Sequence, residues 1–105
     1  MAKKKIVHIA QSAGGVAEYL YIFVKNLDNV NYENILIVSE DYEGQIERFK
    51  PYVSNIYIVP MIREIEFKSD IKAIFKVKKI LKQIKPDIVY MHSSKAGAIG
   101  RIALA

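Results

Sequence analysis

Short apolar runs alternate with longer stretches of helical spacing along this chain, and that alternation restricts the folds it can adopt. The expected strands are residues 5–10, 35–38, 56–59 and 88–92, and the expected helices are residues 16–27, 43–50, 68–84 and a last one from residue 94. The run at 35–38 is continuously apolar, as in a parallel strand covered on both faces. Helices that connect parallel strands through right-handed crossovers are the natural solution, so the order predicts an α/β domain.

The longest expected helix, residues 68–84, divides its side chains between two faces. The apolar stripe, expected to face the core, is Ile71, Ile74, Phe75, Val77, Ile80, Leu81 and Ile84, and the lysine face is Lys68, Lys72, Lys76, Lys79, Lys82 and Lys85. A solvated surface is one interpretation of the lysine face. Attraction to an anionic membrane surface is the other.

Composition narrows the class of protein further. The 105 residues are 51% hydrophobic and 26% charged, which is the balance of one globular domain. The absence of cysteine excludes disulfides and thiolate metal sites. A net charge of +5 favours an anionic partner. The three arginines are not interleaved with aromatic residues that could stack on bases, so we expect no nucleic acid partner. The apolar run at residues 6–10 is too short for a signal peptide, and we expect a cytoplasmic protein.

The final helix is expected to be amphipathic and to reach Ala105 without a cap or a glycine stop. About four strands followed by an unfinished crossover predict a partial domain over residues 1–105. The fold class that we expect is therefore a three-layer, Rossmann-like α/β domain with a parallel sheet.

Two polar segments marked by glycine follow expected strands, at the sheet edge where open α/β domains bind ligands. The first contains Gly14 and Gly15, before the helix at 16–27; Glu18 stands where a dinucleotide fingerprint would have its third glycine. These glycines are explained equally well by a tight turn and by close approach of a ligand. The second begins at His92, and Ser94 is expected to cap the following helix.

The sequence lacks the residues that several other catalytic mechanisms require. The sequence has no histidine pair at metal-ligand spacing, no GxSxG motif and no cysteine nucleophile. We therefore assign no catalytic residue and no metal ligand within the chain.

Three stretches resemble the N-terminal domains of family 4 glycosyltransferases, of the type that makes capsular and exopolysaccharides. They are KIVHIAQSAGGVAEYL at the start, REIEFKSDIKAI in the middle and KPDIVYMHSSKAGAIGRIA at the end. These enzymes have the GT-B architecture of two Rossmann-like domains facing a cleft. The resemblance implies an N-terminal, acceptor-side domain, with the C-terminal donor-binding domain absent from this chain.

The resemblance also implies a reaction and a set of substrate-binding residues. A retaining enzyme would transfer a sugar from a nucleotide-sugar donor to a saccharide or lipid-linked acceptor in surface polysaccharide biosynthesis, without a metal or another cofactor. Gly14 and Gly15 would approach the donor phosphates and the acceptor, and His92, Ser93 and Lys95 would lie on the acceptor side. The chain alone is expected to be inactive.

Two alternatives remain open. One is a fragment of a sugar-nucleotide 2-epimerase, which shares the two-domain architecture. The other is a non-catalytic α/β module that binds a partner through the unfinished sheet edge or the last helix.

Overall fold

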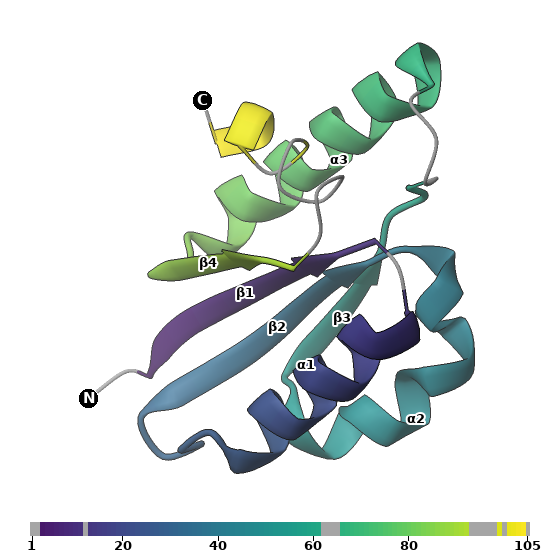
Figure 1. The fold of residues 1–105 in the computed structure, drawn as a ribbon. Helices are drawn as coiled ribbons and strands as arrows, with labels where there is room; N and C mark the ends of the chain where they lie inside the picture. Colours follow the sequence, from purple (N-terminus) through teal and green to yellow (C-terminus); the bar gives the residue numbers. More distant parts are fainter. Residues whose placement is uncertain (1–2, 12, 62–65, 93–98, 100, 105) are drawn as a thin grey trace.

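The computed structural model describes residues 3–11, 13–61, 66–92, 99 and 101–104, and its elements alternate as expected (Figure 1). They are β1 (Lys4–Ala10), α1 (Gly14–Asn26), β2 (Tyr32–Val38), the 3-10 helix η1 (Glu40–Gln45), α2 (Ile46–Phe49), the 3-10 helix η2 (Lys50–Tyr52), β3 (Asn55–Ile58), α3 (Phe67–Ile84) and β4 (Ile88–Met91). Residues 101–104 are helical as well.

The strands form one parallel sheet in the order β3-β2-β1-β4. β1 pairs along its whole length with β2, from Lys4 opposite Tyr32 to Ala10 opposite Val38. On its other side, β1 pairs with β4, from Ile6 opposite Ile88 to Ile9 opposite Met91. The predicted four-stranded, parallel, Rossmann-like α/β fold is therefore confirmed.

Helices cover both faces of this sheet. Figure 1 shows α1 and α2 against one face, and α3 with the C-terminal helical turn against the other. Val7 and Ile9 of β1 face the α3 side, where they pack with Val77 and Leu81. Ala10 belongs to the opposite cluster, with Leu20 and Val24 of α1. β1 is thus sealed on both faces, as a central parallel strand requires.

The connection between β2 and β3 differs from the prediction. We expected a loop at 39–42 and one helix at 43–50, but a continuous 3-10, α and 3-10 run covers residues 40–52. Ser39 starts it, because its Oγ accepts a hydrogen bond from the amide of Asp41 at 3.2 Å. Pro51 falls inside the last 3-10 turn, where its missing N–H costs little.

The apolar stripe expected on α3 is too wide. Ala73, Val77, Leu81 and Ile84 are buried, whereas Phe75 is 65% exposed. Ile71 is also exposed, and Ile74 and Ile80 are only partly buried. A helix lying on a sheet buries a narrow strip of its surface, so the flanking apolar positions stay outside the core. All six members of the lysine face are exposed.

Both ends of α3 have local stop signals. Glu66 caps the start by accepting a hydrogen bond from the amide of Ser69 at 2.6 Å, and Lys85 ends the helix in the left-handed conformation at φ 54°. Within the described part of the chain, no helix combines the length and apolarity that crossing a bilayer requires.

Candidate functional site

The order in which successive strands are added to the sheet changes sides at β1. β2 and β3 lie on one side of β1 and β4 lies on the other, so the carboxyl ends of β1 and β4 form a topological switch point. The amide of His92 donates to the carbonyl of Ile9 at 2.9 Å, which extends the β1–β4 pairing by one residue. His92 is thereby fixed beside the segment that leads from β1 into α1.

The structure brings part of the predicted substrate-binding set to this edge. Gly14 and Gly15 open α1 immediately after β1, and His92 follows β4. Ser93 and Lys95 lie outside the described residues. The structure thus places the two glycines and His92 on neighbouring strand ends, and their binding role stays a prediction.

Gly15 has no steric reason to be glycine. Gly14 and Gly15 form the exposed first turn of α1, two residues earlier than predicted, and no described glycine has a positive φ. A Cβ added at Gly15 would meet nothing within 4 Å. A tight turn therefore does not explain this glycine, whereas open space in front of the backbone is what a closely approaching ligand needs.

The start of α1 is also open electrostatically. Ala13 precedes it and gives no side-chain cap, and the first turn carries no acidic residue. As far as the described part of the chain shows, the N–H groups and the positive end of the helix dipole are therefore available to an oxygen-rich or negatively charged group.

Buried hydrogen bonds fix the backbone at the carboxyl end of β1, just before these glycines. Ser39 is fully buried, its hydroxyl donates to the carbonyl of Gln11, and its amide donates to the carbonyl of Ala10 at 3.3 Å. Gln11 is buried as well. The end of β2 thus fixes the backbone from which the glycine turn begins.

A hydrogen-bonded histidine pair lies under the edge, and our sequence analysis missed one of its members. His8, in the middle of β1, is fully buried. Its Nδ1 lies 3.1 Å from Nε2 of His92, and its Nε2 lies 3.0 Å from Oδ1 of Asn34, which is buried in β2. The available signal was a polar residue inside each of two apolar strand runs, because such residues are buried only when they are hydrogen-bonded.

Aromatic rings surround the histidine pair. Tyr90 stacks on His8 with a centroid distance of 5.7 Å, and Phe23 of α1 meets the same ring edge-on at 5.3 Å. Tyr19, whose ring centroid is 6.1 Å from that of His92, is 61% exposed. An apolar hollow of about 350 Å³ continues along α1 from Tyr19 to Leu27. Exposed aromatic faces beside polar groups are suited to pack against the apolar faces of sugar rings.

Burial sets the charge of both rings. It is the main reason that the pKa of His8 is lowered to about 4; the hydrogen bond to Asn34 opposes this shift in part, and the neighbouring His92 contributes a smaller lowering. Burial also lowers the pKa of His92 below its ordinary value. Both imidazoles are therefore neutral at pH 7, and the edge presents a neutral ring rather than a cation.

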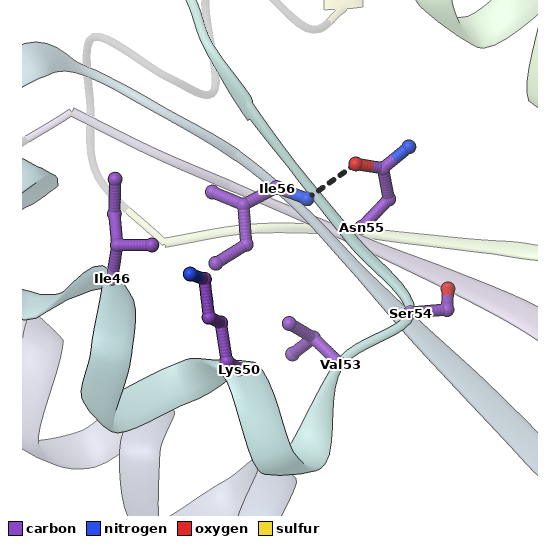
Figure 2. Close-up of a pocket in the computed structure, with 6 residues that line it drawn as sticks. All are labelled: Ile46, Lys50, Val53, Ser54, Asn55 and Ile56. Carbon is purple, nitrogen blue, oxygen red and sulfur yellow. Dashed lines mark hydrogen bonds between the residues drawn. The ribbon is translucent and has the colours of Figure 1, made fainter.

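A second hollow, of about 440 Å³, lies at the outer side of the sheet between α2 and the start of β3 (Figure 2). Its cation, Lys50, pairs with Glu47 at 2.8 Å. The amide of Ile56 donates to Oδ1 of Asn55 at 2.9 Å, which blocks part of the free sheet edge. This hollow is at the amino end of β3, away from the switch point, and gathers none of the predicted residues.

Among the described residues, no three histidine, aspartate or glutamate side chains are grouped to hold a metal ion. The metal requirement of any reaction stays a prediction.

Comparison with known proteins identifies relatives of this chain. The family model described as Glycosyltransferase Family 4 matches residues 13–105. The chain is 32% identical, over 97% of its length, to UDP-Gal:alpha-D-GlcNAc-diphosphoundecaprenol alpha-1,3-galactosyltransferase of Escherichia coli, and it spans 27% of the length of that enzyme.

Solved structures share the fold at low sequence identity. MurG of Acinetobacter baumannii superposes with a TM-score of 0.72 at 18% identity, over 95% of this chain and 31% of MurG. A UDP-N-acetylglucosamine 2-epimerase gives a TM-score of 0.68 at 16% identity, over 97% of this chain and 30% of the epimerase. At such identities the likeness concerns the fold alone.

The buried state of His8 predicts a pH dependence of stability. The pKa of His8 is about 4 in the folded chain and returns to its ordinary 6.5 on unfolding, so between these values the unfolded chain binds more protons. The free energy of unfolding should therefore be highest above pH 6.5 and fall by about 3 kcal/mol towards pH 4 from His8 alone.

Urea unfolding of the wild type and of His8→Phe at several pH values between 4 and 7 measures this dependence. The variant should lose most of the slope in this window. An unchanged slope would show that His8 does not titrate as its burial requires.

Proposed function

The chain belongs to glycosyltransferase family 4, and we propose that it forms the acceptor-side half of an enzyme that transfers a sugar from a nucleotide-sugar donor to a saccharide or lipid-linked acceptor. The family match over residues 13–105 and the identity of 32% to a bacterial galactosyltransferase support the transferase class. Because the chain spans 27% of that relative, the donor-binding half is proposed to lie outside these residues.

The carboxyl edge of β1 and β4 is the observation that carries the proposal. It combines an uncapped helix start behind open space at Gly15 with a neutral, half-buried His92 on the adjacent strand. The helix start suits oxygen atoms of a diphosphate, whereas neutral polar and aromatic groups suit the hydroxyls and apolar faces of a sugar.

The reaction proposed is transfer with retention at the anomeric carbon. The bond between that carbon and the diphosphate oxygen breaks with its electron pair left on the diphosphate, a bond to the acceptor oxygen forms, and the acceptor hydroxyl gives its proton to the departing diphosphate. In this chemistry, the contribution of the present chain is to orient the acceptor and to stabilise negative charge on the departing diphosphate. We propose that neither a metal nor another cofactor takes part.

The name of the Escherichia coli relative specifies UDP-Gal and a GlcNAc-diphosphoundecaprenol acceptor. We propose the same classes for this chain, a nucleotide sugar and a lipid-linked saccharide, in the cytoplasmic steps of surface polysaccharide biosynthesis such as capsule formation. The 2-epimerase alternative rests on likeness of fold at 16% identity, and the family match favours sugar transfer over it.

The space in front of Gly15 gives a test of the site. Gly15→Ala should stabilise the chain slightly, by up to about 1 kcal/mol, because alanine favours the helix and its Cβ meets no protein atom. The same methyl group should weaken the binding of a short-chain GlcNAc-diphosphate lipid about tenfold, measured by calorimetric titration, because it fills the space that the ligand would occupy.

Gly44→Ala is the matched control, since a Cβ at Gly44 also meets nothing within 4 Å and Gly44 lies in η1, after β2, and not at the ends of β1 and β4 that form the proposed site. It should change binding little. Equal binding by the wild type and both variants would place the ligand elsewhere and contradict the proposed site.

We also propose that the lysine face of α3 brings the protein to an anionic membrane. Phe75, 65% exposed, and Ile71, 37% exposed, lie one turn apart on this helix. Lys72 and Lys79 are neighbours of Phe75 on the helix surface, three and four residues away. Apolar side chains that the core does not use are thus available to enter the lipid interface between attracting lysines.

Co-sedimentation with vesicles tests this contact. Binding to vesicles of phosphatidylglycerol should exceed binding to phosphatidylcholine and should weaken as salt rises. Phe75→Ser should lower it several-fold, whereas Val30→Ser, at a position that is 79% exposed but remote from the lysine face in sequence, should not. Equal losses in the two variants would refute a specific role for α3.

A further inference from the structure

We propose that His8, held by Asn34, is a positioning residue that fixes the tautomer of His92, so that Nδ1 of His92 acts as a hydrogen-bond acceptor for a saccharide hydroxyl. The tautomer part follows from the contacts of the described residues alone. The saccharide part rests on the proposed function.

The donor and acceptor in each of these hydrogen bonds can be assigned from Asn34. Its Oδ1 can only accept, so the proton of the 3.0 Å contact must be on Nε2 of His8. A neutral imidazole carries one ring proton, and Nδ1 of His8 is therefore the acceptor in the 3.1 Å contact with His92. Nε2 of His92 must donate in that contact, which leaves Nδ1 of His92 without a proton.

The ring of His8 has little freedom to change this arrangement. It is fully buried and is hydrogen-bonded between Asn34 and His92. Tyr90 stacks on the same ring, and Phe23 contacts it edge-on. Asn34 is itself 3% exposed in the middle of the sheet. A buried hydrogen-bonded chain of this kind fixes orientation, because any rotation leaves a buried polar atom without its partner.

Among the described residues, no cation or carboxylate is found to act on the two rings. The groups that act on His8 are Asn34 of β2 and His92 after β4, together with the loss of water contact. His92 is shifted by burial alone. Phe23 of α1 and Tyr90 of β4 complete the surroundings without a charge at neutral pH.

An unprotonated Nδ1 discriminates between ligand groups. It can accept a proton from a sugar hydroxyl, but it has nothing to donate to a fully ionised phosphate oxygen, and two acceptors facing each other repel. Among the described residues, the side chain of His92 bonds to His8 through Nε2, and none bonds to its Nδ1. We therefore assign the hydroxyl contact to His92 and leave phosphate contacts to the amide groups at the start of α1.

Nitrogen-15 NMR of the imidazole rings reads the tautomers directly. The sequence contains only two histidines, so both ring systems can be assigned from the single variants His8→Phe and His92→Phe. In the wild type at pH 7, we expect both rings to carry their proton on Nε2. A proton on Nδ1 of His92 in the wild type would overturn the inference without any variant.

Two substitutions then test the role of His8. His8→Phe keeps an aromatic ring against Phe23 and Tyr90 but removes the acceptor, and Asn34→Leu keeps His8 but removes the group that sets its tautomer. In both variants, His92 should change from one tautomer to a mixture. Ser39→Ala is the matched control, because it removes another buried hydrogen bond, from the Ser39 hydroxyl to the carbonyl of Gln11. It leaves the hydrogen bonds among Asn34, His8 and His92 in place. Its His92 tautomer should be unchanged.

Titration with ligands separates this inference from the proposed function. A short-chain GlcNAc-diphosphate lipid should shift the Nδ1 resonance of wild-type His92, and its affinity should fall about tenfold in His8→Phe, while the affinity for inorganic pyrophosphate stays the same. Equal saccharide affinity in His8→Phe would overturn the positioning role and leave the function intact. The predicted tautomer without any saccharide binding would instead overturn the function and the hydroxyl assignment.

Discussion

The parallel pairing of β1 with a strand on each side is the constraint on which the other features of the molecule depend. β1 bonds to β2 along one edge and to β4 along the other, both of its faces are covered by helices, and its side chains from Ile6 to Ala10 are buried. The same pairing places the end of β4 beside the start of α1. Without it, neither the glycine turn nor His92 would have a defined position relative to the other.

Burial of polar groups in β1, in β2 and directly after β2 has a physical cost that only complete hydrogen bonding offsets. His8, Asn34 and Ser39 are all buried, and each has a partner: a second histidine, a histidine and a backbone carbonyl, respectively. These contacts converge on the carboxyl edge from below. Apolar side chains would fill the same volume, so these polar side chains are better explained by the need to orient His92 at the carboxyl edge of the sheet.

The sequence predicted the element order well, because a continuous apolar run and a helical stripe are local patterns. It also predicted that Gly14 and His92 would share an edge, since carboxyl ends of parallel strands always do. It could not predict the contacts of His8, whose partners lie 26 and 84 residues away and depend on strand order. Phe75 was wrongly assigned to the core because a stripe of apolar residues does not reveal how much of it the sheet can cover.

The central claim is that a saccharide acceptor binds at the switch point between β1 and β4. Backbone amide NMR shifts, recorded while a short-chain GlcNAc-diphosphate lipid is titrated into the labelled chain, test it most directly. The account predicts that the largest shifts occur at Gln11, Gly14, Gly15 and His92. Shifts confined to the hollow around Lys50 and Ile56, or no shifts at saturating ligand, would contradict it.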